Sequence, residues 1–203
     1  MAINDLFAFK SWVLELKQKK FVLAELPQEF SMSTDEAQVG WIVPFTSCDL
    51  NEYSRINLLV SWRNQNRESF ISCDEVDFES TTKWFRTQVL ENTNRQLFWI
   101  LSTDKVHIGH IGILYDEEGE RFELDSVLKG IDSDGGIMWL ALRYLEKLMH
   151  EKFSASRLYL RVLESNQKAI NFYRRNGYEE SQNTEISYTI NDSRKVIFMV
   201  KSI

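Results

Sequence analysis

The sequence predicts an α/β fold, a mixed sheet of six to seven strands with helices on both faces. Short apolar, β-prone runs at 97–102, 106–115 and 122–129 predict consecutive strands. An amphipathic pattern over 137–151 predicts a helix, and alternation at 158–162 predicts a strand after it. Because this order of elements forms a crossover unit, we expect a parallel pair of strands near residues 125 and 160.

Length and composition fit one globular domain. Of the 203 residues, 43% are hydrophobic and 27% are charged, and the formal net charge of −6 without a dominant Lys/Arg cluster argues against nucleic-acid binding. Cys48 and Cys73 form no CxxC motif, and no apolar run approaches the ~20 residues of a membrane span. With no signal-peptide pattern, we expect a cytoplasmic protein that contacts no membrane.

Residues 1–40 are expected to be an N-terminal extension, and residues 41–203 the main domain. The extension begins with apolar residues at helical spacing, namely Leu6, Phe9, Val13 and Leu16. The main domain begins with a strand at 41–46 and two helices. Asp49 is the expected cap of the first helix, and Ser80 or Thr81 that of the second.

Two carboxylates share one face of the strand predicted at 122–129. Alternation places Glu123, Asp125 and Val127 on this face, opposite the apolar residues Phe122, Leu124 and Leu128. A neighbouring carboxylate raises the pKa of one of the pair, so Glu123 or Asp125 could remove a proton from an amine. A solvated strand face or an ion-pair site is the alternative for both residues.

Three glycines between Gly130 and Gly136 precede the helix predicted from residue 137. Exposed backbone N–H groups and the helix dipole favour an anion at such a position, so a phosphate site is one interpretation, and an ordinary turn is the other. The sequence has no GxxxxGK[ST], GxGxxG or GxSxG motif, which argues against a Walker loop, a dinucleotide fingerprint and a hydrolase elbow.

A second informative segment spans residues 160–178. It holds a helix that begins at Ser165 or Asn166 and ends before Gly177. Its residues resemble the GNAT superfamily of N-acetyltransferases through Leu160-Arg161-Val162, Asn166, Ala169-Ile170, Phe172-Tyr173 and Asn176-Gly177-Tyr178. The resemblance covers residues 41–201 and implies that the parallel pair splays apart, with the acyl thioester of acetyl-CoA in the gap.

The resemblance also implies a set of site residues. The backbone of Val127 and Lys129 would pair with pantetheine, Asn166 would contact the same arm, and Tyr173 would protonate the CoA thiolate. Backbone amides would hold the phosphates at Asp132, Ser133, Asp134, Gly135 and Gly136. The chain departs from the family's Q/R-x-x-G-x-G/A pattern, since Ser133 and Met138 occupy the first and last positions. Packing of a buried ring is the alternative for Tyr173.

The expected activity is therefore transfer of acetyl from acetyl-CoA to a primary amine of a small molecule. Trp62-Arg63-Asn64 and Trp84-Phe85 resemble the branch that acts on amino sugars, so a nucleotide-linked amino sugar is a candidate acceptor. A non-catalytic acyl-CoA-binding or interaction module is one alternative, and a protein N-terminus or another small amine is the second. A homodimer is the default assembly.

No metal is expected. His107 and His110 lie three residues apart, a spacing that places them on opposite faces of a regular strand.

Overall fold

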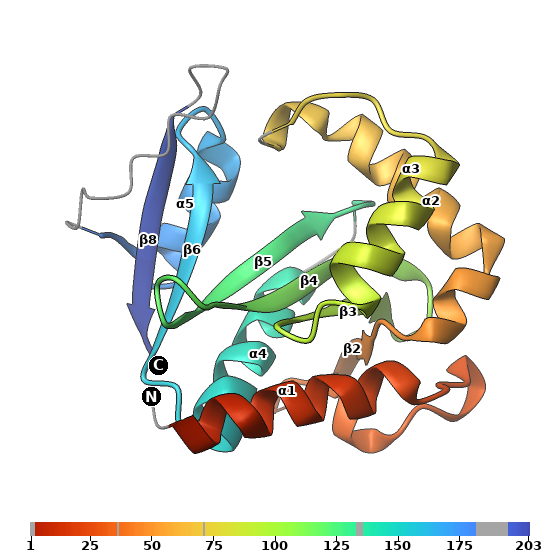
Figure 1. Cartoon of the computed structure of the whole chain (residues 1–203), viewed down its shortest axis with the longest axis horizontal. Coiled ribbons are helices and arrows are strands. Elements are labelled where there is room, and N and C mark those ends of the chain that lie inside the picture. Colours follow the sequence, from red (N-terminus) through yellow and green to blue (C-terminus); the bar gives the residue numbers. More distant parts are fainter. Residues whose placement is uncertain (1–2, 36, 71, 133–135, 182–194) are drawn as a thin grey trace.

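The computed structural model describes residues 3–35, 37–70, 72–132, 136–181 and 195–203. These residues form one eight-stranded sheet with the order β1-β2-β3-β4-β5-β6-β8-β7, in which only β5 and β6 are parallel neighbours (Figure 1). The strands are β1 (Ser31–Ser33), β2 (Gln38–Pro44), β3 (Arg95–Ser102), β4 (His107–Asp116), β5 (Arg121–Lys129), β6 (Arg157–Leu163), β7 (Glu179–Glu180) and β8 (Val196–Ser202). The predicted mixed α/β fold is confirmed, with a strand count slightly above six to seven.

Helices cover both faces of the sheet (Figure 1). The main ones are α1 (Ile3–Gln18), α2 (Tyr53–Gln65), α3 (Phe78–Trp84), α4 (Ile137–Phe153) and α5 (Gln167–Arg175), and α3 continues into the π-helical η5 (Phe85–Leu90). Short 3-10 turns are η1 (Leu23–Glu25), η2 (Gln28–Phe30), η3 (Ser47–Asn51) and η4 (Arg67–Ser69). None of the helices described is long and apolar enough to cross a bilayer.

The caps of α2 and α3 differ from those expected. Asp49 lies inside η3, where it completes a capping box with Thr46, and α2 begins after Glu52. The cap of α3 is Asp77, whose Oδ1 accepts a hydrogen bond from Ser80 N–H at 2.8 Å. The Ser80 hydroxyl oxygen in turn accepts a hydrogen bond from Asp77 N–H at 3.0 Å. Ser80 is therefore the third helical residue of a capping box and not its first member.

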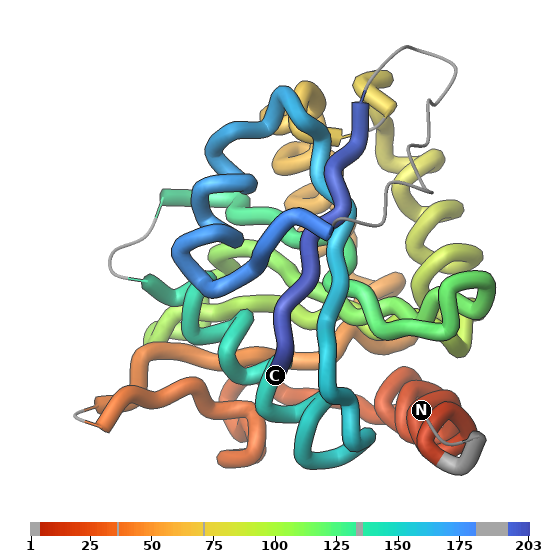
Figure 2. Tube along the Cα trace, turned by 90° about the vertical axis from the view of Figure 1, so that its left-hand side faces the viewer, coloured from red at the N-terminus to blue at the C-terminus, as the bar shows by residue number. Residues whose placement is uncertain are grey.

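Two apolar cores lie on opposite faces of the sheet. The first core joins α1 and α4 to the sheet, and Phe9 and Val13 of α1 are fully buried in it. The second core joins α2 and η5 to the other face, through Trp62, Phe85 and Trp99. The N-terminal forty residues thus contribute both a buried helix and the edge strand β1, which pairs with β2. At the far side of the sheet, β6 and β8 run side by side (Figure 2).

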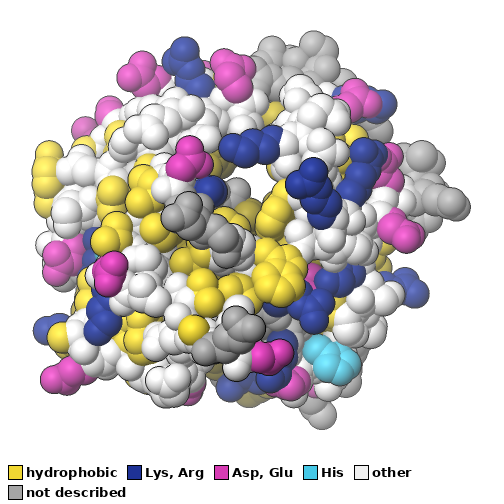
Figure 3. Space-filling model, turned by 180° about the vertical axis from the view of Figure 1, so that it is seen from behind, with side chains coloured by type: hydrophobic (Ala, Val, Ile, Leu, Met, Phe, Trp, Pro, Cys, Tyr) yellow, Lys and Arg dark blue, Asp and Glu magenta, His cyan; other side chains and the backbone are white. Residues whose placement is uncertain are grey.

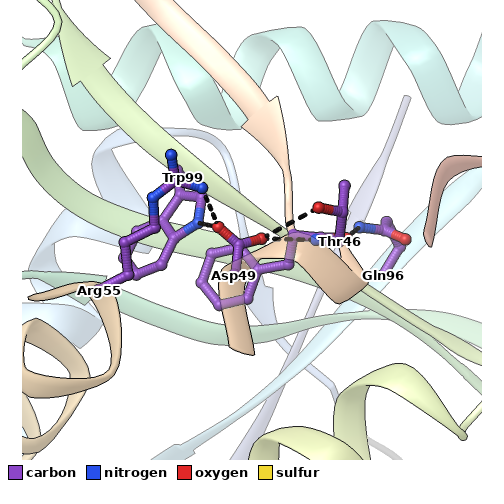
Figure 4. A network of polar contacts seen from close by, with 6 residues as sticks. Thr46, Asp49, Arg55, Gln96 and Trp99 are labelled. Carbon is purple, nitrogen blue, oxygen red and sulfur yellow. Dashed lines mark hydrogen bonds and ion pairs between the residues drawn. The ribbon is translucent and has the colours of Figure 1, made fainter. Parts of the chain in front are cut away.

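A buried polar network fixes the start of α2 against β3 (Figure 4). Asp49 is 1% exposed, and its Oδ2 accepts a hydrogen bond from Thr46 N–H at 2.6 Å. Its Oδ1 accepts from Trp99 Nε1 at 3.1 Å and is ion-paired with Arg55. Because a buried carboxylate is tolerated only when its oxygens are paired, these contacts hold Trp99 and α2 in one arrangement.

A bulge in β4 directs the side chains of His107 and His110 to the same face of the sheet, where both contact tryptophan rings. The register with β3 shifts between Ile100 and Leu101, so one extra residue of β4 lies between His107 and His110. The His107 ring is 4.8 Å from that of Trp99, and the His110 ring is 6.4 Å from that of Trp62. The expectation of opposite faces was wrong, because a bulge breaks strict alternation along a strand.

A second bulge changes the alternation of β5. The β4–β5 register shifts between His110 and Gly112, and Ser126 has a φ of 48°. Up to Leu124 the expected faces hold, but Val127 packs against the α1/α4 core and Leu128 belongs to the α2/η5 core. Val127 therefore does not continue the face of Glu123 and Asp125, as the sequence pattern predicted, since the bulged residue reverses the phase.

Candidate active site

The parallel strands β5 and β6 separate soon after they meet. Their ladder pairs only Glu123 with Tyr159 and Leu124 with Leu160, and the strands then diverge (Figure 1). A cavity of about 590 Å³ lies between the diverging strands and the helices α2 and α3. In Figure 3 the surface is hollowed in its upper central part, and Lys and Arg side chains stand around the opening.

Two walls enclose this cavity. We call the lining residues of β5, β6 and α5 the strand wall, comprising residues 123–128, 161–163, 166, 169 and 173. We call the lining residues of α2, α3 and the chain between them the helix wall, comprising residues 59, 63, 69, 70, 72, 76, 80, 81 and 84. His110 of β4 and Arg95 of β3 line the cavity between the two walls.

Tyr173 belongs to the strand wall. Its side chain is buried, with its ring 5.8 Å from that of Tyr178. Burial raises the pKa of the Tyr173 hydroxyl well above its ordinary value, and the nearby Asp125 carboxylate raises it further. The hydroxyl is therefore protonated at neutral pH and can donate a proton or a hydrogen bond inside the cavity.

Both carboxylates nominated from the sequence line the cavity, and both are ion-paired with arginines. Glu123 is 2% exposed, with Arg121 Nη2 at 2.9 Å from its Oε1 and Arg161 Nε at 2.8 Å from its Oε2. Asp125 Oδ2 lies 2.7 Å from Arg95 Nε. Sequence reasoning placed the two acids together but did not find their partners. Arg121 is on β5 itself, whereas Arg95 and Arg161 come from β3 and β6.

The expected phosphate segment is described only in part. Ser133, Asp134 and Gly135 lie outside the described residues. Asp132 is exposed, and its Oδ1 is 3.3 Å from Lys129 Nζ. Gly136 precedes α4 with a φ of 80°, a left-handed conformation that favours glycine, and a side chain there would meet open space.

Gly130 has a different role from that suggested by the glycine pattern. A Cβ atom at this position would lie 2.1 Å from atoms of the Trp62 ring. The absence of a side chain therefore allows α2 to pack against the end of β5.

Asn166 is confirmed as the start of α5. Its Oδ1 accepts a hydrogen bond from Ala169 N–H at 3.1 Å, which satisfies one of the free amides of the first helical turn. The residue also lines the cavity, so it connects the start of the helix to the strand wall.

A second hollow, of about 550 Å³, lies between the start of α4 and α5. It is lined by Gly136, Trp139, Lys168, Asn171, Phe172, Arg175 and Asn176. Lys168 and Arg175 give it positive charge, and Trp139 is 45% exposed. An aromatic ring beside two cations suits a nucleotide with an outer phosphate.

Sequence reasoning also gave no role in the cavity to two further polar residues, His110 and Arg63. His110 was considered only as a metal ligand. It lines the cavity because it pairs with Leu128, next to the bulge of β5. Arg63 was noted only as part of a motif. Its Nη2 donates to the Ser72 carbonyl and its guanidinium lies 3.8 Å from the centre of the Phe70 ring, while Nη1 is buried without a hydrogen-bond partner among the described residues.

Within the described ranges, no group of three or more His, Cys, Asp or Glu side chains could hold a metal ion. The polar groups that line the cavity include the Tyr173 hydroxyl, the ion-paired acids Glu123 and Asp125, and the His110 imidazole.

Comparison with known proteins identifies the family. A sequence model of the acetyltransferase (GNAT) domain matches residues 29–179, well over half of the chain. The chain belongs to the GNAT acetyltransferase family. GNAT domains generally carry out acyl-CoA-dependent acetyl transfer, and the family assignment leaves the acceptor open. A search of curated protein sequences gives no match.

Solved GNAT structures share the fold at low sequence identity. RimL, a ribosomal L7/L12 α-N-protein acetyltransferase solved with coenzyme A, is 13% identical with a TM-score of 0.68, over 86% of this chain and 97% of that one. FdhC, described as a nucleotide-linked sugar GNAT, is 16% identical with a TM-score of 0.60, over 81% and 86% of the two chains. The spermidine/spermine N-acetyltransferase SpeG from Vibrio cholerae is 15% identical with a TM-score of 0.56, over 81% and 92%.

Proposed function

We propose that this protein transfers an acetyl group from acetyl-CoA to the primary amine of a small acceptor, with an amino sugar linked to a phosphate-bearing group as the preferred class. The observation that carries the proposal is the cavity at the point where β5 and β6 diverge, with Tyr173 in its wall. Membership of the GNAT family supports acetyl-CoA as the donor.

The strand wall would hold the donor. Pantetheine would lie along the free edge of β5, beside the backbone of Val127 and Lys129, with Asn166 on its other side. By the family resemblance, the segment 132–136 would bind the pyrophosphate. Of its residues, Gly136 directly precedes α4, and a helix N-terminus favours an anion. Lys168 and Arg175 of the neighbouring hollow would receive the outer phosphate.

Transfer would be direct. The amine nitrogen attacks the thioester carbon and releases one proton to water, and the C–S bond breaks with its electron pair on sulfur. The Tyr173 hydroxyl gives its proton to the thiolate and regains one from water. The Val127 amide at the bulge would stabilise the negative charge on the carbonyl oxygen.

Glu123 and Asp125 were nominated as bases. Their ion pairs with arginines favour a different assignment, in which they hold Arg161 and Arg95 at the cavity walls.

The helix wall favours an anionic acceptor over a polycation. Arg63 has no carboxylate within ion-pair distance in the part of the chain that the structure describes, and both lining acids already have arginine partners. Phe70 and Trp84 offer aromatic surface beside the hydroxyls of Ser80 and Thr81, a combination suited to a sugar. A polyamine such as spermidine would instead require unpaired acids.

The test is CoA release from acetyl-CoA with a panel of amines. The panel holds glucosamine, glucosamine 6-phosphate, a nucleotide-linked amino sugar, spermidine and a peptide with a free N-terminus. We expect turnover that is fastest with a phosphate-bearing sugar and that falls roughly 100-fold or more in Tyr173→Phe.

Tyr144→Phe is the matched control, because the Tyr144 hydroxyl donates to the Glu29 carbonyl away from the cavity. Tight CoA binding with no turnover on any amine would contradict the proposal and favour a non-catalytic acyl-CoA-binding module.

A further inference from the structure

His110 lies where β4 meets the bulge of β5, and it lines the cavity between the two walls. The side chain is 5% exposed, and its ring lies 6.4 Å from that of Trp62 and 6.1 Å from that of Phe45. These two aromatic neighbours limit the orientations of the imidazole, so its two nitrogens have fixed surroundings.

One hydrogen bond defines the tautomer of this imidazole. Nδ1 lies 2.6 Å from the carbonyl oxygen of Ser126, the residue with positive φ at the bulge. A carbonyl oxygen can only accept, so Nδ1 carries the hydrogen. Burial lowers the pKa of His110 to about 4, with the Ser126 bond acting in the opposite direction. At neutral pH the ring is therefore uncharged, and Nε2 has a free lone pair.

The two carboxylates in the cavity wall are ion-paired with arginines. Both oxygens of Glu123 face guanidinium groups, and Asp125 lies against Arg95. Across the described residues, no group forms a hydrogen bond with His110 Nε2. This nitrogen is thus an uncharged acceptor beside the bulge, whereas the Asp125 carboxylate there is held by its ion pair with Arg95.

We propose that His110 Nε2 accepts a hydrogen bond from the attacking amine and holds its lone pair toward the thioester carbon. The proposal rests on the acetyl transfer proposed above, and it makes His110 a catalytic residue that touches the acceptor. An amine placed about 3 Å from the thioester carbon reacts as a near-attack conformer, whereas a freely turning amine does not.

The proton balance of the step is complete without an ionised histidine. The C–N bond forms, and the nitrogen gives up one proton to water in the cavity. The C–S bond breaks, the sulfur keeps the electron pair and takes the proton of the Tyr173 hydroxyl, and water returns a proton to Tyr173. Throughout the step, the Nδ1–H of His110 donates its hydrogen bond to the Ser126 carbonyl oxygen.

Two substitutions test the roles of the two ring nitrogens of His110 separately. In His110→Asn the amide NH₂ can replace Nδ1–H toward Ser126, but nothing replaces Nε2. In His110→Gln the longer side chain can bring an oxygen to the place of Nε2. With the best amine of the panel, we expect kcat/KM for the amine to fall roughly 10- to 100-fold in His110→Asn and to be partly restored in His110→Gln. The KM for acetyl-CoA should stay unchanged in both.

His150→Asn is the matched control, because His150 also has Nδ1 beside a carbonyl, that of Ala155 at 3.2 Å, and does not line the cavity. If wild type is active and His110→Asn keeps full activity, the role of His110 is overturned while the proposed function stands. If wild type acetylates no amine, the proposed function fails and this inference fails with it.

A measurement on the wild-type protein covers the case in which the variants do not fold. The ¹⁵N chemical shifts of the His110 ring at pH 7 should show Nδ1 protonated and Nε2 unprotonated. A ring protonated at Nε2 would overturn the proposal, because Nε2 would then be a donor.

Discussion

The two walls of the cavity are built in different ways. The strand wall comes from one continuous part of the chain, in which β5, α4, β6 and α5 follow one another and local motifs position the residues. The helix wall depends on contacts between distant segments: Trp62 of α2 packs beside Trp99, His110 and Gly130. Motif residues therefore determine the wall proposed for the acetyl donor, and core packing determines the wall proposed for the acceptor.

Trp62→Ala tests the helix wall most severely. We expect a loss of about 3–5 kcal/mol in the free energy of unfolding, because a fully buried indole leaves a cavity that the core refills only in part. Urea unfolding measures the change. Tyr53→Ala, at an exposed aromatic residue of the same helix, should change stability by less than about 1 kcal/mol. Equal effects of the two substitutions would show that the wall does not depend on Trp62.

Glu123→Gln tests the strand wall. We expect a loss of about 3 kcal/mol, because Arg121 and Arg161 would face each other without the buried charge between them. Glu117→Gln is the control, since its ion pair with Lys10 lies at the exposed surface and should change stability far less. Thermal or urea unfolding distinguishes the two, and a wild-type stability in Glu123→Gln would mean that the arginines do not need this acid.

The junction between the walls should be sensitive to acid. The folded pKa of His110 is about 4, below an unfolded value of about 6.5, so in this range the unfolded chain binds the additional proton. Stability therefore falls as the pH drops through this range, by about 2 kcal/mol between pH 7 and pH 5 from His110 alone. His107, whose pKa burial also lowers to about 4, adds to the same trend.

Unfolding measured at both pH values should show a smaller difference in His110→Asn than in wild type. An unchanged difference would mean that His110 is as easily protonated in the folded protein as in the unfolded chain.

Asn166 gives the smallest effect and separates two roles of one residue. Asn166→Ala should lose about 1 kcal/mol through the missing helix cap. Asn166→Ser should keep the cap and the stability, since serine is an equally good capping residue, but should bind CoA more weakly if the amide contacts pantetheine. Calorimetric titration with CoA checks this, and equal affinity in Asn166→Ser would limit the residue to its capping role.

Much of the fold follows from the sequence because the signals are local. Alternation and helical spacing predicted the hairpin of β3 and β4 and the β5-α4-β6 unit. Capping residues predicted the start of α5 at Ser165 or Asn166, and the structure has Asn166.

The bulges were not predicted, because strict alternation was assumed along both strands. Gly109, next to Ile108, and Gly112, at the shift opposite Ser126, are the only local signals. Beyond each bulge the side chains lie on the face opposite to the one predicted. The prediction was therefore wrong for His107 relative to His110, and for Val127 relative to Glu123.

The candidate site was predictable to the same extent. Tyr173, Glu123 and Asp125 do line one cavity. Arg121 lies two residues from Glu123 on β5, but Arg161 and Arg95 come from β6 and β3, so only the tertiary fold reveals these two ion pairs. The same holds for His110, whose environment is made by α2, β2 and β5 together.

The most direct test of the central claim is a structure of this protein with acetyl-CoA. The account predicts that pantetheine lies between the diverging strands β5 and β6, with the thioester carbonyl at the Val127 amide and the sulfur within hydrogen-bond distance of the Tyr173 hydroxyl. Acetyl-CoA bound elsewhere, with the gap between the two strands empty, would contradict it.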